Sequence, residues 1–169
     1  LHGHTIAIDG FKGSANLVAL LAAHSQGYVV SISKPSLPIE SLRDRLREFF
    51  TPCLMTNLRT LKEVLPIVGE LKFLKLIIYV QDTVLDHEVS EFLTDLETIP
   101  KTAKIVSVDE VIKLGESHDF NPDTLSRTDA LLFYTTGNTQ RERPIVISQS
   151  QLCFSVLSTV QMLRDWDLE

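Results

Sequence analysis

Tyr-Thr-Thr-Gly-Asn-Thr-Gln-Arg-Glu-Arg-Pro-Ile-Val-Ile-Ser, residues 134–148, is the most informative stretch of this 169-residue chain. It follows an apolar run, Ala130 to Phe133, that is typical of a buried strand. A strand that leads into a Thr- and Gly-rich loop can gather backbone N–H groups and hydroxyls around a phosphate. Arg141 and Arg143 follow and add positive charge. The same composition also suits a polar β-hairpin, because clusters of Gly, Asn and Thr mark turns in general.

The rest of the chain alternates short apolar runs with amphipathic stretches. This alternation predicts βα units and therefore an α/β fold with a largely parallel sheet. The expected strands are residues 5–9, 28–32, 52–56, 74–80, 104–108, 130–133 and 144–147. The expected helices are residues 15–25, 38–50, 58–68, 89–96, 107–115 and 150–163. A polar, irregular segment, residues 116–128, precedes the Thr- and Gly-rich loop.

Three local signals set the ends of these helices. Gly27 lies just past the first helix, where a C-terminal glycine is common. Pro66 should kink or end the third helix. Ser107, with Glu110 three positions later, forms a predicted capping box.

Helical spacing also predicts which side chains face the core. In helix 38–50 the expected apolar face consists of Ile39, Leu42, Leu46, Phe49 and Phe50. Its expected solvent-facing side consists of Arg43, Asp44, Arg47 and Glu48. In the last helix the expected inward residues are Leu152, Val156, Val160 and Leu163. We expect Phe154, Leu157 and Trp166 to contact another domain or chain.

Residues 134–148 resemble the phosphate loop of the adenylate-forming (AMP-binding) superfamily. Its pattern is Tyr-Thr-Ser-Gly-Thr-Thr-Gly-x-Pro-Lys-Gly-Val. The matching residues are Tyr134, Thr135, Gly137 and Thr139, with Thr136 and Asn138 as conservative replacements. By this resemblance the residues that bind the phosphates are Thr135, Thr136, Gly137, Asn138, Thr139 and Arg143.

Four later positions depart from the superfamily pattern. Gln140 replaces a glycine that allows close approach of the ligand. Glu142 replaces proline and adds negative charge beside the phosphates, whereas Arg143 keeps the charge of lysine in a planar fork. Pro144 replaces glycine and lacks an N–H donor. Three of these changes weaken phosphate binding, so we expect the isolated chain to bind ATP no more tightly than about 1 mM.

The resemblance extends along most of the chain and is closest to the long-chain fatty acyl-CoA synthetases. Residues 17–38 are similar to a Leu/Ala-rich helix followed by a glycine and a Val-Val-Pro-Leu-Asp-Pro-Ser-Leu segment. Residues 74–78 match a Leu-Lys-x-Ile-Ile strand, and residues 105–111 are similar to the segment ahead of the phosphate loop. The shared order of these segments carries the inference, because none of them is specific alone.

The resemblance implies a three-layer α/β fold with helices on both faces of a mostly parallel sheet, as in the N-terminal domain of an acyl-CoA synthetase. Residues 1–169 would form a single domain or a partial one. Superfamily members convert ATP and a carboxylate to an acyl-adenylate, and a thiol such as CoA then takes the acyl group. The implied cofactors are ATP and Mg²⁺. The implied partners are fatty acid, CoA, and the rest of a parent protein or another protein chain.

Three interpretations stay open. The chain is a segment of an AMP-forming acyl-CoA synthetase, an acid–thiol ligase, and is inactive by itself because the superfamily's adenine pocket and C-terminal lysine domain lie beyond residue 169. It is alternatively a catalytically dead relative that serves as a structural or protein-interaction module. The third interpretation is an unrelated flavodoxin-like binding domain. No catalytic residue is assigned.

Composition excludes some other classes. The net charge is −6 and the basic residues are scattered, which argues against nucleic-acid binding. No apolar run approaches the roughly 20 residues that span a bilayer, and we see no secretory leader. Cys53 and Cys153 lie in apolar contexts, so we expect buried free thiols and an intracellular location, in the cytoplasm or on the cytoplasmic face of a membrane.

The histidines and serines do not form a recognisable catalytic or metal motif. His2 and His4 have no carboxylate or thiolate cluster near them in sequence, so no metal site is assigned. His24 is expected at the boundary of the core. The Gly-x-Ser-x-Gly motif of many serine hydrolases is absent from the sequence.

Overall fold

The computed structural model describes residues 4–9, 13–33, 37–81, 102–119, 128–135 and 142–165. The helix predicted for residues 89–96 lies outside these ranges. So do Trp166, residues 136–139 of the predicted phosphate loop, and residues 120–127 of the predicted irregular segment.

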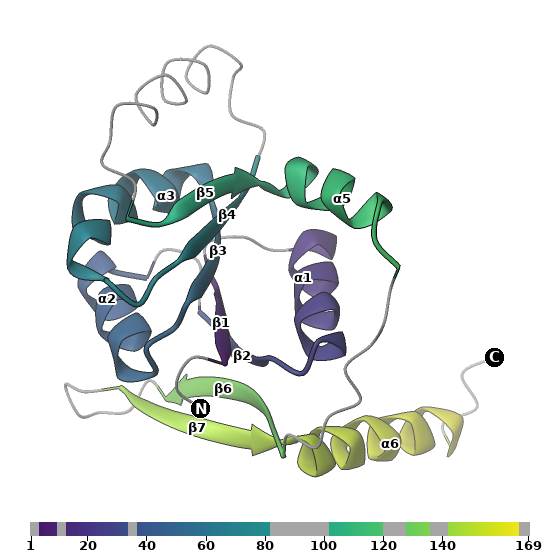
Figure 1. The fold of residues 1–169 in the computed structure, drawn as a ribbon. Helices are drawn as coiled ribbons and strands as arrows, with labels where there is room; N and C mark the ends of the chain where they lie inside the picture. The colour runs from purple at the N-terminus through teal and green to yellow at the C-terminus, as the bar shows by residue number, and fades with distance from the viewer. Residues whose placement is uncertain are drawn as a thin grey trace.

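Strands and helices alternate along the described chain, except that β5 follows β4 and β7 follows β6 with no described helix between them (Figure 1). The strands are β1 (Thr5–Ile8), β2 (Val29–Ile32), β3 (Cys53–Asn57), β4 (Leu76–Val80), β5 (Lys104–Ser107), β6 (Asp129–Thr135) and β7 (Arg143–Ser148). The helices are α1 (Ser14–Ser25), α2 (Ile39–Glu48), α3 (Leu58–Val64), the 3-10 helix η1 (Leu65–Glu70), α5 (Val108–Glu116) and α6 (Gln149–Asp165).

The strands form one seven-stranded sheet in the order β5-β4-β3-β1-β2-β6-β7. All neighbouring pairs are parallel except β6 and β7, which are antiparallel. The order reverses at β1, with β2 on one side and β3 on the other, as in doubly wound α/β folds. The prediction of a mostly parallel α/β sheet is therefore confirmed.

Helices cover both faces of this sheet and make three layers. Figure 1 shows α2 and α3 on one face and α1 and α5 on the other. Under α2 and α3 the core includes the fully buried Leu42, Leu46, Leu54, Leu61, Leu71, Leu74 and Ile77. Under α1 it includes Ile8, Ala19, Ala23, Val30, Ala130 and Leu131. Each fully buried aliphatic side chain contributes about 1.5–3 kcal/mol, so these clusters dominate the stability of the sheet.

The predicted end signals act as expected. Gly27 has a φ of 70°, in the left-handed region that glycine adopts at little cost. Helix α3 ends at Val64, and the chain continues through Pro66 as the 3-10 helix η1. At the start of α5 the Glu110 N–H donates to Ser107 Oγ at 3.1 Å, and the Ser107 N–H donates to Glu110 Oε2 at 2.7 Å. The capping box is confirmed.

The predicted inward face of the last helix is mostly wrong. Leu152 packs against the core around β6, but Val156, Val160 and Leu163 are exposed. Helix α6 extends away from the sheet beyond its first turns (Figure 1). Its apolar stripe therefore has no cover among the described residues, although its spacing is that of a buried helix face.

Two further predictions about burial fail. Phe50 was expected on the apolar face of α2 but is exposed, because α2 ends at Glu48 and Phe50 has a φ of 47°, which takes it off the helical spacing. Its ring contacts Phe73 edge-on, with 5.6 Å between ring centroids. Cys53 is a buried free thiol as predicted, whereas Cys153 is exposed because it lies on α6.

Candidate functional site

The two described members of the predicted phosphate loop are neighbours. Thr135 ends β6 and Arg143 begins β7, and they are partners across the antiparallel pair. The Thr135 hydroxyl donates to the Arg143 carbonyl at 3.5 Å. Thr136, Gly137, Asn138 and Thr139 lie outside the described residues. The structure therefore places both ends of the loop at the carboxyl end of β6.

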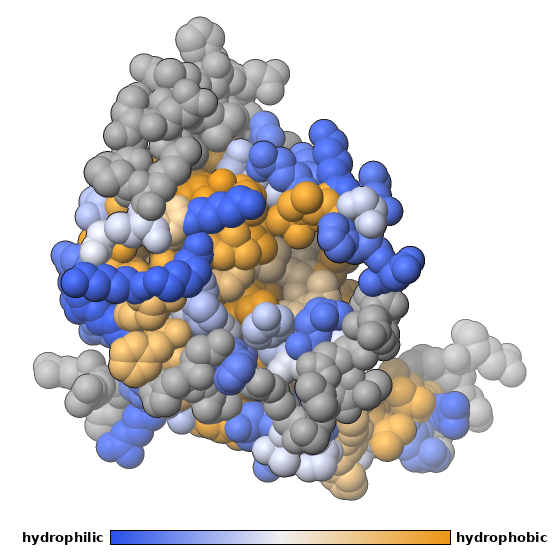
Figure 2. Space-filling model, viewed as in Figure 1, coloured by the Kyte–Doolittle hydropathy of each residue, from blue (hydrophilic) through white to orange (hydrophobic). Residues whose placement is uncertain are grey.

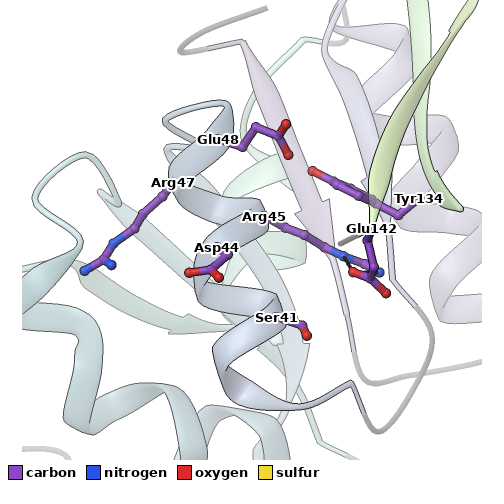
Figure 3. A pocket seen from close by; sticks show the side chains of 7 residues that line it. All are labelled: Ser41, Asp44, Arg45, Arg47, Glu48, Tyr134 and Glu142. Carbon is purple, nitrogen blue, oxygen red and sulfur yellow. Dashed lines mark hydrogen bonds and ion pairs between the residues drawn. The ribbon is translucent and has the colours of Figure 1, made fainter. Parts of the chain in front are cut away.

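A pocket of ≈ 470 Å³ lies beside this end of the sheet. It lies between helix α2 and the β6–β7 pair, and Figure 3 shows its side chains. Its lining residues are Ser41, Asp44, Arg45, Arg47, Glu48, Tyr134 and Glu142. A volume of a few hundred Å³ is typical of small-molecule sites.

Arg45 is the centre of this pocket. Its side chain is 9% exposed, and both its Nε and Nη2 donate to Glu142 Oε2, at 2.9 and 2.7 Å. Its Nη1 donates to Ser33 Oγ at 3.0 Å. The guanidinium carbon also lies 4.1 Å from the centre of the Tyr134 ring, a cation–π contact. A buried cation needs such partners, because its desolvation is otherwise very costly.

Tyr134, at the end of β6, lies across the pocket from the backbone of helix α2 (Figure 3). Its hydroxyl is buried, and the Glu48 carboxylate is its nearest polar neighbour. In Figure 3 this hydroxyl points toward the Glu48 carboxylate. Burial, and then the charge of Glu48, raise the pKa of Tyr134, although Arg45 opposes the shift. The phenol is therefore neutral at physiological pH, and Tyr134 contacts Arg45 through its aromatic ring.

Asp9, which follows β1, extends the charged network into the core. It is buried, and its Oδ1 has no hydrogen-bond partner among the described residues. Burial raises the pKa of Asp9 to about 6, while a hydrogen bond with Ser33 and the charge of Arg45 lower it. Ser33 thus stands between the Asp9 carboxyl and the Arg45 guanidinium. This places the network at the carboxyl end of β1, where the strand order reverses and α/β proteins usually bind ligands.

Arg45 was missed by the sequence analysis, which assigned it to neither face of its helix. A signal was present, since Leu42, Arg45 and Leu46 follow the i, i+3, i+4 spacing of a buried helix face. An arginine at such a position needs a buried anion. That anion, Glu142, is 97 positions away, and no local pattern connects the two.

The lining of the pocket is acidic as a whole. Asp44, Glu48 and Glu142 supply three carboxylates, against the two guanidinium groups of Arg45 and Arg47. Arg47 points away from Tyr134 in Figure 3 and pairs at 2.8 Å with Glu70 on the surface. Arg45 has the planar fork that suits a carboxylate or a phosphate, but Glu142 already occupies it.

A second pocket, of ≈ 490 Å³, lies on the other face of the sheet between α1 and α5. Figure 2 shows apolar surface in this hollow. Its lining is mostly aliphatic and includes Val18, Met55, Ile78, Val111 and Ile112. Among the described residues no charged side chain lines it, and its polar lining residues are Ser14, Gln26 and Tyr28.

No protein-family model and no curated protein sequence matches the chain. Solved structures do match its fold. The A-PCP didomain of carboxylic acid reductase from Segniliparus rugosus, in complex with AMP, has a TM-score of 0.72 and 16% identity over 90% of this chain. The chain has the fold of the adenylate-forming enzymes. Its sheet and helices correspond to part of the N-terminal domain of these enzymes.

Two more adenylate-forming structures support this assignment. A long-chain-fatty-acid CoA ligase from Rhodopseudomonas palustris has a TM-score of 0.71 and 15% identity over 97% of this chain. The anthranilate CoA ligase AuaEII, in complex with anthranoyl-AMP, has a TM-score of 0.67 and 14% identity over 87%. The chain spans 22%, 36% and 25% of the three matched chains, in the order given. Because the sequence identities are only 14–16%, these matches show that the fold is similar and nothing more.

Proposed function

We propose that this chain is a segment of an AMP-forming acyl-CoA synthetase-like protein, which activates a fatty acid as an acyl-adenylate and then transfers it to CoA. The segment is not active by itself. The observation that carries the proposal is the fold, which matches adenylate-forming structures over 87–97% of this chain but over only 22–36% of theirs. Tyr134 and Thr135 support it, because they end β6 where the chain enters the predicted phosphate loop.

In this proposal the loop binds the phosphates of ATP together with Mg²⁺. Hydroxyls and backbone N–H groups would hold the phosphate oxygens, and a guanidinium would offset their charge. The residues in these roles are Thr135, Thr136, Gly137, Asn138, Thr139 and Arg143. The antiparallel pairing of Thr135 with Arg143 supports it by bringing the first hydroxyl and the cation of this set to the same end of the sheet.

Exposed apolar side chains on α6 support the idea that the segment belongs to something larger. Phe154 is 74% exposed and Leu157 is 68% exposed. Figure 2 shows apolar residues along this helix. Contiguous apolar surface of this kind usually contacts a partner. The rest of the parent protein, or another protein chain, would cover it.

The location of the protein is a further part of this proposal. Within the described ranges, every helix is too short or too polar to cross a bilayer. We place the protein inside the cell, in the cytoplasm or on the cytoplasmic face of a membrane. The free thiol of Cys53 supports a reducing compartment.

One observation favours a second candidate function, a catalytically dead relative that acts as a structural or interaction module. Glu142 stands where the superfamily has proline, and its carboxylate is bound to Arg45 beside the loop. A fixed negative charge at this point opposes the approach of a triphosphate. A protein that no longer binds ATP would tolerate it.

The two candidates differ in ATP–pyrophosphate exchange. The experiment uses the protein that carries this segment, with Mg²⁺, ATP and a panel of fatty acids. The ligase proposal expects exchange that depends on the fatty acid and falls by at least about tenfold in Arg143→Ala. Arg59→Ala, an exposed arginine on α3 that does not line the pocket, is the matched control and should exchange normally. Absence of exchange with every acid would support the dead relative.

A further inference from the structure

We propose that Arg45 is a phosphate-binding site of this chain and that Glu142 is its internal occupant, a carboxylate that a phosphate group must displace in order to bind. The inference goes beyond the proposed function and holds whether or not the parent protein is a ligase. It concerns a cation that lies on α2, outside the loop to which the resemblance assigns phosphate binding.

The cation side of the site is built into the fold. Arg45 has two contacts that fix its guanidinium. Its Nη1 donates to Ser33 Oγ at 3.0 Å, and its guanidinium stacks on the Tyr134 ring. Neither contact involves Glu142. The guanidinium would therefore keep its position and its charge after Glu142 has moved away. A fixed cation that is 9% exposed is a much stronger anion site than a flexible one on the surface.

Glu142, the anion that now pairs with Arg45, is the partner that a phosphate group can replace. Glu142 is 32% exposed, against 9% for Arg45, so water and solutes reach the Glu142 carboxylate more readily than the guanidinium. It comes immediately before β7, at the end of the segment that connects the two antiparallel strands. Both hydrogen bonds from Arg45 end on one oxygen, Oε2. A phosphate, with several oxygens, can accept from Nε and Nη2 on separate atoms, which is the better geometry for the fork.

The charge of the pocket lining determines whether a phosphate group can bind to Arg45. With Glu142 in place the pocket carries three carboxylates and two guanidinium groups, so a phosphate dianion is repelled. With Glu142 displaced, the Arg45 guanidinium no longer holds a carboxylate, while Asp44 and Glu48 stay in the lining and Arg47 stays paired with Glu70. The space in front of Arg45, part of the ≈ 470 Å³ pocket, is ample for one phosphate group. Glu142 thus acts as an autoinhibitory anion for this site.

The experiment measures binding of inorganic phosphate to the full chain by isothermal titration and by thermal unfolding, at constant ionic strength. The first variant is Glu142→Gln, which keeps the shape of the side chain and removes its charge. We expect it to bind phosphate at least about tenfold more tightly than the wild type and to gain thermal stability with added phosphate. The wild type should show neither effect at the same concentrations.

Two controls assign the effect to this pair. Glu48→Gln removes one negative charge from the same pocket but leaves Glu142 on Arg45, so it should bind phosphate like the wild type. Arg45→Met combined with Glu142→Gln should lose the gain. If Glu142→Gln does not fold, Glu142→Asp, which keeps the charge but shortens the reach to Arg45, should show a smaller gain. Equal gains for Glu142→Gln and Glu48→Gln would overturn the proposal, and so would phosphate binding that survives without Arg45.

Discussion

The guanidinium of Arg45 lies 4.1 Å above the ring of Tyr134, and this contact joins the two halves of the candidate site. Tyr134 lies near the end of β6 and is the first residue of the segment 134–148. Arg45 belongs to α2, nearly ninety positions earlier in the chain. The contact therefore couples the beginning of the predicted phosphate loop to the helix that covers the opposite side of the pocket.

The two members of the buried pair should differ in their effect on stability. Glu142→Ala leaves a buried guanidinium without its anion, which typically costs about 3–5 kcal/mol of unfolding free energy. Arg45→Met removes the buried charge and leaves a partly exposed carboxylate that water can solvate, so we expect a cost below about 2 kcal/mol. Urea unfolding of both variants measures the difference.

The exposed pair between Arg47 and Glu70 is the control for that comparison. Because both side chains are largely in water, Glu70→Ala should change the unfolding free energy by no more than about 1 kcal/mol. A larger cost for Arg45→Met than for Glu142→Ala would contradict our account of which partner is buried.

The fold was predictable where the determinants are local. The strands around Ile8, Val30 and Ile77 follow from apolar runs, and the capping box of Ser107 from two residues three positions apart. What could not be predicted depends on contacts between distant segments. The exposure of Val156 on α6 depends on what covers that helix, and its spacing carries no information about this.

In the candidate site, too, only the features that depend on local sequence were predicted. The sequence analysis assigned Thr135 and Arg143 to the predicted phosphate loop, and the structure makes them cross-strand partners in the β6–β7 pair. It did not identify Arg45, because the pairing with Glu142 requires the chain fold to bring α2 next to β7. Glu142 was recognised as a negative charge beside the loop, but its positive partner was not.

Asp9 should make stability depend on pH. Its pKa is raised from 3.8 to about 6 in the folded state, so between these values the folded protein binds more protons than the unfolded chain. Stability is therefore higher near pH 4 and is lost as the pH rises through 6, by up to about 3 kcal/mol from this group. Asp9→Asn should remove this dependence and be more stable than the wild type at pH 7. An unchanged pH profile in Asp9→Asn would show that other groups cause it.

The capping box of α5 offers a local test. Ser107→Ala removes the acceptor of the Glu110 N–H and should cost about 1 kcal/mol of unfolding free energy. Ser117→Ala, at the other end of the helix, removes a hydroxyl that bonds to the Leu114 carbonyl on the exposed surface. We expect it to change stability by less than about 0.5 kcal/mol. Thermal unfolding followed by circular dichroism compares the two.

Helix α6 should tolerate polar substitutions on its exposed stripe. Phe154→Ser should leave the unfolding free energy of the isolated chain within about 0.5 kcal/mol of the wild type and reduce self-association seen by light scattering. Leu152→Ser, at the position that packs on the core, should cost about 2 kcal/mol or more. Similar losses for both variants would mean that the chain covers the whole helix by itself.

We propose that residues 134–143 bind the phosphates of the nucleotide in this adenylate-forming fold. The most direct measurement is NMR of the amide-labelled chain during titration with Mg-ATP, which detects binding even at millimolar affinity. We predict that the largest shifts fall on Thr135, Gly137, Thr139 and Arg143, with smaller shifts at Arg45. Shifts confined to the apolar pocket between α1 and α5, or no shifts at saturating nucleotide, would contradict the claim.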